Sequence, residues 1–590
     1  MLASYGVSRT LTPIVIRLLL RGEHARREEH RSPTALDRFH DRFNQGFDRF
    51  RDYYTWLLAR ILERRRATPL VGLAVVASAA ALTFFVGSDF FPRVDAGLIA
   101  LHVRAKPLTR VEHTEEIFQQ VEDIVHEVIP ARDLDLILDN IGLPQRTYNL
   151  AFGSQTMIGT NDGQILIALK EGHEPTLSYL RRLRREMRLR HPDLLTYFEP
   201  ADMVTQILNF GIPAQIDIQV QGPARDKNLQ IAQDIRREMA AVPGLIDVHI
   251  HQELNAPELK YEVDRSRALE LSQQMQSIAN NVNISLSSSQ QVAPNLWTDQ
   301  TTGTPYYLAV QTPEYRLQNL NDLENTPIAT ASTGGGTVTN TLGNIARLKR
   351  QSIQTVYSHS NVQNVFDVYA GVQNRDLGSV ASEVSKIMAE NETHLAPGNH
   401  IIVRGQIESM NSAFERLTLG LVFAAVFVYL LMVVNYQSFI DPLAVILALP
   451  GAGAGIVLML FVTGTSLSIP SLMGAIMAVG VASANSILLV TFAREQRAAG
   501  HTPMEAALSA GRTRIRPVLM TAAAMIVGML PMAIGAPGEE QNAVLARAVI
   551  GGLIVGTITT LLFVPYLYSV FGRFDAGSEP GEARPAGGQA

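Results

Sequence analysis

Long apolar segments alternate with long polar segments along this chain of 590 residues. A helix needs about 20 largely apolar residues to cross the hydrocarbon core of a membrane. Six segments are of about this length: Pro69–Gly87, Leu417–Val434, Pro442–Thr463, Ser468–Ala493, Pro517–Ala536 and Ala548–Phe571. None of them contains Asp, Glu, Lys or Arg, whose charges are costly in lipid. The pattern therefore predicts six transmembrane helices.

The distribution of arginines predicts how these helices are oriented, because short loops rich in Arg and Lys stay in the cytoplasm. Arginines precede the first span, and five more, Arg494, Arg497, Arg512, Arg514 and Arg516, lie between the fourth and fifth spans. Both loops are predicted to be cytoplasmic. Alternation then places the polar segment Ser88–Arg416 outside the cytoplasm and the end of the chain inside.

Composition narrows the class of protein further. The mean hydropathy of +0.09 is too high for an ordinary soluble protein and too low for a chain that is membrane-embedded throughout. The chain has no cysteine, so the large external segment holds together without disulfides. This favours a bacterial periplasm over a secreted eukaryotic setting. We expect a multi-pass protein of the bacterial inner membrane with a large periplasmic domain.

The external segment repeats a strand, helix, strand pattern four times. Its strands alternate apolar and polar residues, as in "IDIQVQ", and this alternation predicts a sheet with one buried face. The four predicted helices are Val111–Val128, Leu177–Leu189, Leu229–Val242 and Leu377–Met388. Paired βαβ units are typical of ferredoxin-like sandwiches, so two subdomains are expected. A turn-rich stretch between Ser288 and Ser360 interrupts the second and predicts an inserted small domain.

The first 66 residues show neither the long apolar segments nor the strand, helix, strand repeat. The opening "MLASYGVSRTLTPIVIRLLLRG" lacks the features of a signal peptide, and we interpret it as the end of a preceding membrane helix. Phe50–Arg66 places aromatic residues among arginines, which predicts an interfacial amphipathic helix, with a soluble linker helix as the alternative.

The predicted parts are a helix end at 1–22, a cytoplasmic linker and interfacial helix at 23–67, a transmembrane helix at 68–87, a first periplasmic subdomain at 88–200, a second at 201–287 and 361–416, an inserted docking subdomain at 288–360, five transmembrane helices at 417–572 and a disordered cytoplasmic tail at 573–590.

Several motifs along this plan resemble those of one family. They are "SRTLTP" at Ser8–Pro13, "DFFPRVDAG" at Asp89–Gly97, "VDRSRALEL" at Val263–Leu271, "DVYAGVQNRDLGSV" at Asp367–Val380, "RIRPVLMT" at Arg514–Thr521 and "QNAV" at Gln541–Val544. Their order resembles the C-terminal half of the resistance-nodulation-division (RND) exporters of the acriflavine-resistance type.

The resemblance implies a fold. It is an α-helical membrane protein with an α+β periplasmic region, comprising six transmembrane helices, ferredoxin-like βαβ porter subdomains and an inserted small docking subdomain.

The resemblance also implies a mechanism and partners. It implies a proton-driven exporter that needs no cofactor other than the proton gradient and that requires an N-terminal half, which carries the paired aspartates for proton coupling. It further implies a homotrimer that meets a periplasmic adaptor and an outer-membrane channel through the docking subdomain. The surrounding lipid is a further partner, and no nucleic acid is expected.

Candidate proton-relay residues follow from the same resemblance. The multidrug members carry a lysine immediately before an asparagine in the helix that corresponds to Ser468–Ala493, and here these positions are Ala484 and Asn485. Arg514 and Thr521 resemble residues tied to proton passage in the family. Each has a structural alternative: an interhelical hydrogen bond for Asn485, a cytoplasmic anchor for Arg514, and a bond to its own helix backbone for Thr521. Gly474, Ala478, Ala482 and Ser486 recur every fourth residue and predict a ridge for close helix packing.

The substrate pocket is the least specific feature. The resemblance places Phe152, Met157 and Leu166 at or near a pocket between the two βαβ subdomains and implies amphiphilic or hydrophobic substrates; the alternative is that they belong to the core. Metal ions are the alternative substrate class, with Met157, Met203 and the pair His249 and His251 as candidates. The two histidines are two residues apart and therefore lie on the same face of a strand. This face is expected to be solvated, so no metal site is predicted.

Other classes of function find less support. "GGGTVTN" lacks the ending and the preceding strand of a phosphate-binding loop, which argues against a nucleotide-driven pump. No nucleophile, base and orienting group can be assembled from spacing, so an enzyme is not expected. The alternative to transport is a truncated, non-transporting membrane protein or scaffold.

Overall fold

The structure is a computed structural model that describes residues 6–17, 35–64, 66–142, 157–209, 211–290, 292–331, 337–535 and 538–572. The predicted tail at 573–590 therefore lies outside the described residues. The chain divides into two compact units. The helical unit comprises Met1–Asp95, Asp376–Ser379 and Glu408–Ala590, and the sheet unit comprises Ala96–Arg375 and Val380–Ile407.

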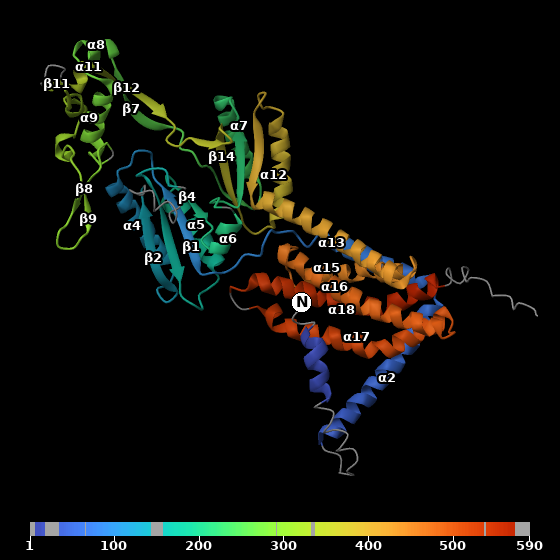
Figure 1. The fold of residues 1–590 in the computed structure, drawn as a ribbon. Coiled ribbons are helices and arrows are strands. Elements are labelled where there is room, and N and C mark those ends of the chain that lie inside the picture. Colours follow the sequence, from blue (N-terminus) through green and yellow to red (C-terminus); the bar gives the residue numbers. More distant parts are fainter. Residues whose placement is uncertain are drawn as a thin grey trace, which may run out of the picture. The chain divides into compact units, whose positions relative to one another are not determined.

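The helical unit is a bundle in which α16, α17 and α18 run side by side (Figure 1). Residues 6–17 are also helical. The bounds of the named helices are α2 Ala35–Glu63, α3 Ala67–Thr83, α13 Gln406–Tyr436, α14 Asp441–Ile446, α15 Leu449–Val462, α16 Ile469–Ala498, α17 Pro503–Ile534 and α18 Glu540–Phe571.

Five spans in the described part of the chain are long and apolar enough to cross a membrane: α13, α14 with α15, α16, α17 and α18. The predicted span Pro442–Thr463 is split into α14 and α15. Pro450 follows this break and has no backbone N–H to continue the helix ladder. Helix α3, the first predicted span, has 17 residues, at the lower limit of what a bilayer requires. A sixth span therefore stays a prediction.

The small-residue ridge of α16 packs against α18, which confirms the predicted close contact. A Cβ added at Gly474 would lie 2.8 Å from the Leu545 carbonyl oxygen, and one at Gly552 would lie 2.6 Å from the Ala478 Cβ. Only glycine permits these approaches, since real Cβ atoms keep a larger distance.

Helix α2 is longer than the predicted interfacial helix and packs one face onto the bundle. Tyr54, Leu58 and Leu62 are buried there, and the Tyr54 hydroxyl donates to the Leu561 carbonyl oxygen at 2.7 Å. Tyr53 and Trp56 remain exposed on the other face. Helix α2 is thus anchored by packing and still presents aromatic side chains to its surroundings.

The sheet unit contains two βαββαβ motifs. The first comprises β1 Leu98–Arg104, α4 Val111–Val128, β2 Leu134–Ile141, β3 Asp162–Leu169, α5 Thr176–Arg190 and β4 Leu195–Glu199. The second comprises β5 Ile216–Gln221, α7 Arg225–Ala241, β6 Leu245–Ile250, β14 Gln363–Val372, α12 Leu377–Glu392 and β15 His400–Gly405. Short elements α6 Met203–Leu208 and β13 Ser358–Ser360 accompany them.

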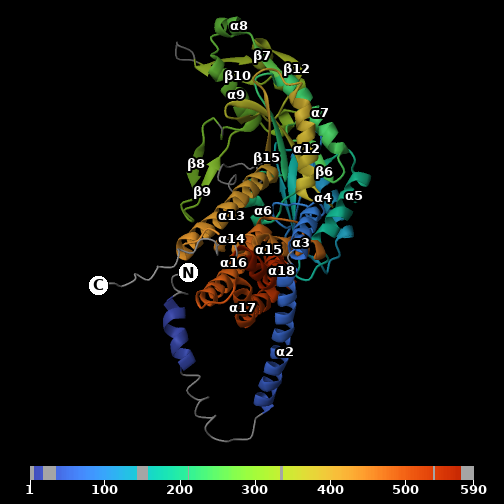
Figure 2. The ribbon, with the colours of Figure 1, turned by 90° about the vertical axis from the view of Figure 1, so that its right-hand side faces the viewer.

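Strand order identifies both motifs as split βαβ folds. The first sheet has the antiparallel order β2-β3-β1-β4. In the second, β14 lies between β6 and β5, and β15 pairs with the other edge of β5. Helices α4 and α5 share a hydrophobic core with the first sheet, while α7 lies on the second with α12 beside it (Figure 2). This is the ferredoxin-like arrangement.

The inserted subdomain extends beyond its predicted boundaries. It contains β7 Ala256–Val263, α8 Arg265–Glu270, α9 Met275–Ser287, β8 Asn295–Thr298, β9 Pro305–Leu308, the 3-10 helix η2 Glu314–Arg316, α10 Leu320–Glu324, β10 Pro327–Ala331, β11 Thr337–Thr341, α11 Leu342–Ile345 and β12 Ala346–Ile353. Ala268 and Ile278 share one core with Ile328, Leu342 and Ile345. This core therefore also includes residues that precede Ser288, the predicted start of the docking subdomain.

Candidate functional site

Two of the three predicted relay residues meet inside the helical unit. Asn485 on α16 is buried, and the Thr521 hydroxyl on α17 lies 3.2 Å from its Oδ1 atom and 2.9 Å from the Val518 carbonyl oxygen. The next residue of α16, Ser486, lies 3.1 Å from the Thr560 hydroxyl on α18. Asn485 and Thr521 thus belong to a polar cluster where three helices meet.

Arg514 does not join this cluster. It precedes Thr521 by seven residues, a rise of about 10 Å along a helix. Its guanidinium carbon lies 4.9 Å from the centroid of the Phe492 ring, and among the described residues its Nε has no hydrogen-bond partner. This contact fits a cytoplasmic anchor that precedes the apolar segment of α17 better than a link to Asn485.

Ala484 lies on a different face of α16 from its neighbour Asn485. Ala484 is exposed, and so are Met473, Met477 and Leu488. Their spacing of four, seven and four residues places them along one stripe of the helix. The position at which the multidrug members carry lysine therefore points away from the interior of this unit.

A half-open cavity of about 1000 Å³ lies between the two βαββαβ motifs of the sheet unit. One part of its wall is apolar and includes Leu136, Leu138 and Leu166. Another part carries the polar side chains of Glu199, Asp217, Gln219, His251 and Asp367. The cavity therefore offers both apolar contacts and polar oxygen ligands.

Asp217 and Asp367 form a buried acidic pair on the neighbouring strands β5 and β14. The Gln219 amide nitrogen donates to both, at 2.9 Å to Asp217 and 3.1 Å to Asp367. The Gln252 amide donates to the other oxygen of Asp367 at 2.6 Å. Asp217 Oδ1 has no hydrogen-bond partner among the described residues. One carboxylate oxygen of the pair is therefore buried with its hydrogen-bonding capacity unmet.

Burial sets the protonation of this pair. Burial, and then the charge of Asp367, raise the pKa of Asp217 well above its usual range, while Arg404 on β15 opposes this shift. Burial also raises the pKa of Asp367, against the hydrogen bonds that it accepts from Gln252, Ser358 and Gln219. Two carboxylates that resist ionisation side by side favour a shared proton or a bound cation.

Both histidines of the "HIH" segment are buried, so the predicted solvated face was wrong. The His249 ring stacks on Tyr197 with the ring centroids 4.0 Å apart, and His251 lies beside Tyr369. Burial lowers the pKa of His249 to about 3 and that of His251 to about 4, so both rings are neutral near pH 7. Neutral imidazole is the form that binds metals, and His251 Nδ1 has no hydrogen-bond partner among the described residues.

A charged cluster lies next to these rings. His102 stands between Asp162, at 2.5 Å, and Glu199, at 3.2 Å. Burial alone would lower the pKa of His102, but the hydrogen bonds and charges of these two carboxylates outweigh it and raise the pKa. Arg104 contacts Asp162 and donates to the backbone oxygen of His251 at 2.8 Å. The hydrogen bond from Arg104 to His251 links the first βαββαβ motif to the second beside the cavity.

Two of the three predicted pocket residues, Leu166 and Met157, lie in the described part of the chain. Leu166 on β3 lines the cavity and is partly exposed. Met157 is buried and is not among the residues of the cavity wall, which agrees with its alternative as a core residue. Phe152 lies outside the described residues. Met203, named as a metal candidate, is on the cavity wall.

The acidic pair was not among the predicted site residues. Its signal was present, since Asp217 and Asp367 are acidic residues inside two of the predicted strands. Across the part of the chain that the structure describes, no three His, Cys, Asp or Glu side chains are already arranged to hold a metal ion. The cavity is therefore a site with unsatisfied ligands and not a preformed metal centre.

Four features occur together in this chain: a bundle of apolar helices, two ferredoxin-like motifs, a buried polar cluster and an acidic cavity. Together they indicate a membrane transporter. Residues 1–572 match the AcrB/AcrD/AcrF family, and the chain belongs to this family. The resemblance to RND permeases is thereby confirmed. This family consists of transporters and not of enzymes.

The sequence identity between this chain and individual relatives is low. The chain is 24% identical over 541 residues to the "Cobalt-zinc-cadmium resistance protein CzcA" of Cupriavidus metallidurans, covering 88% of this chain and 49% of that protein. It is 27% identical over 592 residues to the "Protein HelA" of Legionella pneumophila, covering 99% and 54%. The chain thus spans about half the length of the curated relatives it matches.

A solved structure shares the fold. The crystal structure of a heavy metal efflux pump in its crystal form II has a TM-score of 0.76 and 21% sequence identity, covering 90% of this chain and 52% of that chain. Crystal form I of such a pump gives a TM-score of 0.74.

Proposed function

We propose that this chain forms the C-terminal half of an RND export permease that moves divalent metal cations out of the periplasm or inner membrane. The acidic pair Asp217 and Asp367 carries the proposal, because these buried carboxylates share a cavity wall with the neutral ring of His251. Relatives named for cobalt, zinc and cadmium resistance and for heavy metal efflux support the same substrate class.

This proposal replaces the expectation of amphiphilic substrates, which the relatives support less well. The apolar part of the cavity, including Leu136 and Leu138, keeps amphiphilic compounds as the second candidate. An amphiphile would bind mainly through the area of apolar surface it buries, whereas a cation would bind through the carboxylates. The two candidates therefore differ in what they require of Asp217.

An incomplete ligand set suits a transporter. A metal held by four strong ligands leaves slowly, and transport requires release as well as binding. In the proposed cycle a cation displaces the proton of the acidic pair and breaks the Gln219 bridge, while water completes its coordination. His251 is the further ligand that a small movement of the cavity wall would add.

Zinc titration of the purified chain tests this function. We expect Asp217→Asn to weaken zinc binding by at least about tenfold, whereas Asp226→Asn, at an exposed site on α7, leaves it unchanged. Because the folded pKa of the pair is raised, protons compete with zinc, so affinity falls as the pH is lowered from 8 to 6. Calorimetry measures both effects.

The outcome also separates the two substrate classes. Equal zinc affinity in Asp217→Asn, Asp226→Asn and the parent chain would contradict the metal proposal. Binding of a lipophilic fluorescent dye that persists in Asp217→Asn and is lost on substituting Leu136 and Leu138 by Ser would assign the cavity to amphiphiles instead.

The proposed driving force is the proton gradient, and the proposed relay includes Asn485 and Thr521, whose contact supports such a role. An N-terminal half would supply the acids that take up the proton. The proposed location is the inner membrane, with the sheet unit in the periplasm and the arginine-rich loops in the cytoplasm.

The proposed assembly is a homotrimer that meets a periplasmic adaptor and an outer-membrane channel. The β8–β9 hairpin of the inserted subdomain supports this, because Leu296, Trp297, Tyr306 and Leu308 are all exposed on it. Exposed aromatic and apolar side chains on one hairpin are typical of a contact surface.

Crosslinking tests the docking role. A photoreactive residue at Tyr306 is expected to give covalent products with an adaptor or a channel protein in intact cells. The same residue at Leu189, which is exposed at the end of α5, serves as the control and is expected to give none. Products that match at both positions, or that contain neither adaptor nor channel, would count against docking through this subdomain.

A further inference from the structure

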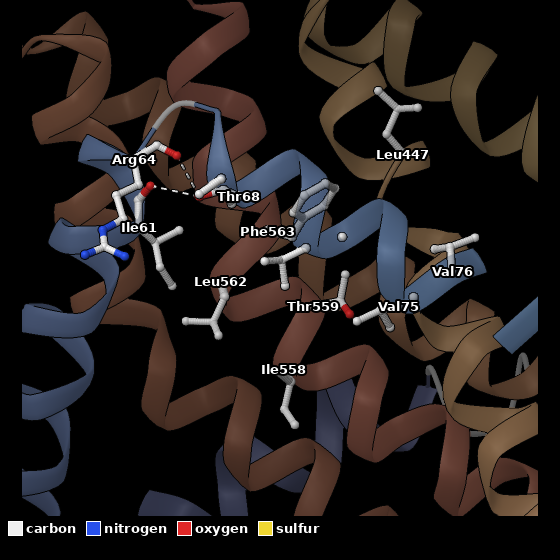
Figure 3. Close-up of a pocket in the computed structure, with 14 residues that line it drawn as sticks. Ile61, Arg64, Thr68, Val75, Val76, Leu447, Ile558, Thr559, Leu562 and Phe563 are labelled. Atoms are coloured by element: carbon white, nitrogen blue, oxygen red, sulfur yellow. Dashed lines mark hydrogen bonds between the residues drawn. The ribbon is translucent and has the colours of Figure 1, made fainter. Parts of the chain in front are cut away.

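A separate groove lies in the helical unit, between α3, α15 and α18 (Figure 3). It has a volume of about 330 Å³ and is lined mainly by apolar side chains, among them Val71, Val75, Ile558, Leu562 and Phe563. This volume lies at the lower end of the range for sites that hold a small ligand or part of a larger one. The groove shares no residue with the polar cluster at Asn485 or with the cavity of the sheet unit.

Close helix packing shapes this groove. A Cβ added at Gly72 would lie only 2.8 Å from the ring of Phe563, so glycine lets that ring reach the backbone of α3. The Thr559 hydroxyl donates to the Val555 carbonyl oxygen of its own helix at 2.9 Å. Its polar atom is therefore satisfied, and this part of the wall presents no unmet hydrogen bond to an occupant.

One end of the groove is basic. Arg64 stands there, just after the last turn of α2, and the Thr68 hydroxyl lies 3.1 Å from the carbonyl oxygens of both Ile61 and Arg64 (Figure 3). The bond to Ile61 links the end of α2 to the first turn of α3. The Arg64 side chain is exposed and has no ion pair with another described residue. Arg60 and Arg66 lie nearby in sequence, with Glu63 as an exposed acid beside them.

We propose that this groove binds an anionic phospholipid, with one acyl chain between α3 and α18 and the phosphate on Arg64. Basic pockets between membrane helices at the cytoplasmic side suit anionic headgroups, and the positive-inside rule predicts that side for this end of the bundle. Arginine pairs with phosphate through two parallel hydrogen bonds. A zwitterionic lipid would bring a positive group next to Arg60 and Arg66.

The lining of the groove argues for an acyl chain as the occupant. Its wall is mainly apolar, and a flexible acyl chain needs no hydrogen-bond partners. The exposed Tyr53 and Trp56 on α2, whose rings stack 5.8 Å apart, are amphipathic side chains that favour the headgroup region.

Photolabelling of the purified full chain in nanodiscs tests the proposal. The bilayer is phosphatidylcholine that contains a small fraction of either phosphatidylglycerol or phosphatidylcholine with a photoreactive acyl chain. We expect phosphatidylglycerol to label the lining segments of α3 and α18 about fivefold more strongly. Arg64→Gln should reduce this labelling to the phosphatidylcholine level, and Arg49→Gln, at an exposed position on α2 away from the groove, should not.

Mass spectrometry of the labelled peptides gives the readout. Since Arg64 is exposed, Arg64→Gln is expected to fold, and thermal unfolding of both variants checks this. Equal labelling by the two lipids, or equal loss in Arg64→Gln and Arg49→Gln, would overturn the proposal. Displacement of the label by a lipophilic dye but not by excess phosphatidylglycerol would assign the groove to an amphiphile and overturn it as well.

Discussion

Expressed alone in an efflux-deficient bacterial host, this chain is expected to leave zinc accumulation at the level of the empty vector. Coupling to a proton gradient requires a titratable acid inside the membrane, and none of the six predicted spans contains Asp or Glu. Asp441, at the start of α14, is buried but pairs with Arg494 at 3.1 Å, so its charge is already compensated. Cellular zinc and dye retention are the measurements.

Co-expression with a matching N-terminal half is the control and is expected to restore efflux. Within that pair, Asn485→Leu should abolish transport without reducing insertion if Asn485 serves the relay, because removing one amide from a helix favours insertion. Proton-dependent efflux by the chain alone would contradict the first prediction. Efflux at the full rate by the Asn485→Leu chain together with the N-terminal half would contradict the relay hypothesis.

The βαβ motifs were predictable from the sequence because their information is local. The predicted helix Val111–Val128 coincides with α4, and the segment "IDIQVQ" coincides with β5. Strands that alternate apolar and polar residues and helices with a periodic apolar face need no distant contact to be recognised. Once two consecutive βαβ units are assigned to one ferredoxin-like fold, that fold determines the order of the strands.

The missed features depend on distant contacts. The sequence left open whether the polar face of β5 is solvated or covered by another part of the chain, and in the structure Asp217 and Gln221 are buried. Nothing within six residues of strand specifies whether another motif covers its second face. The extent of the docking subdomain likewise depends on distant contacts, since Ala268 joins a core completed by Leu342 and Ile345.

The predicted relay residues show that the spacing of a motif does not determine which of its residues are in contact. Family resemblance grouped Asn485, Arg514 and Thr521, but only Asn485 and Thr521 touch. Two turns of helix separate Arg514 from Thr521, and the side chain of Arg514 packs against Phe492 at the end of the apolar segment. A motif preserves the order of residues along a helix, whereas contact also depends on which neighbouring helix faces each turn.

Ala484→Lys is expected to be tolerated only in the presence of the N-terminal half. Ala484 lies on the exposed stripe of α16, so a lysine there would not collide with the interior of the helical unit. With a partner that places aspartates on this stripe, the lysine pairs with them. Without a partner it is a bare cation in lipid, which costs about 3 kcal/mol by insertion scales.

The amount of folded protein in the membrane and its thermal unfolding temperature measure this difference. Ala484→Leu is the matched control and should be tolerated in both settings, because it adds bulk on the same stripe without charge. Ala482→Lys should be lost in both, since Ala482 is buried and lies 3.6 Å from the position of a Cβ added at Gly556 on α18. If Ala484→Lys loses as much protein with the N-terminal half as without it, no acidic partner faces this stripe, and proton coupling must enter the bundle by another helix.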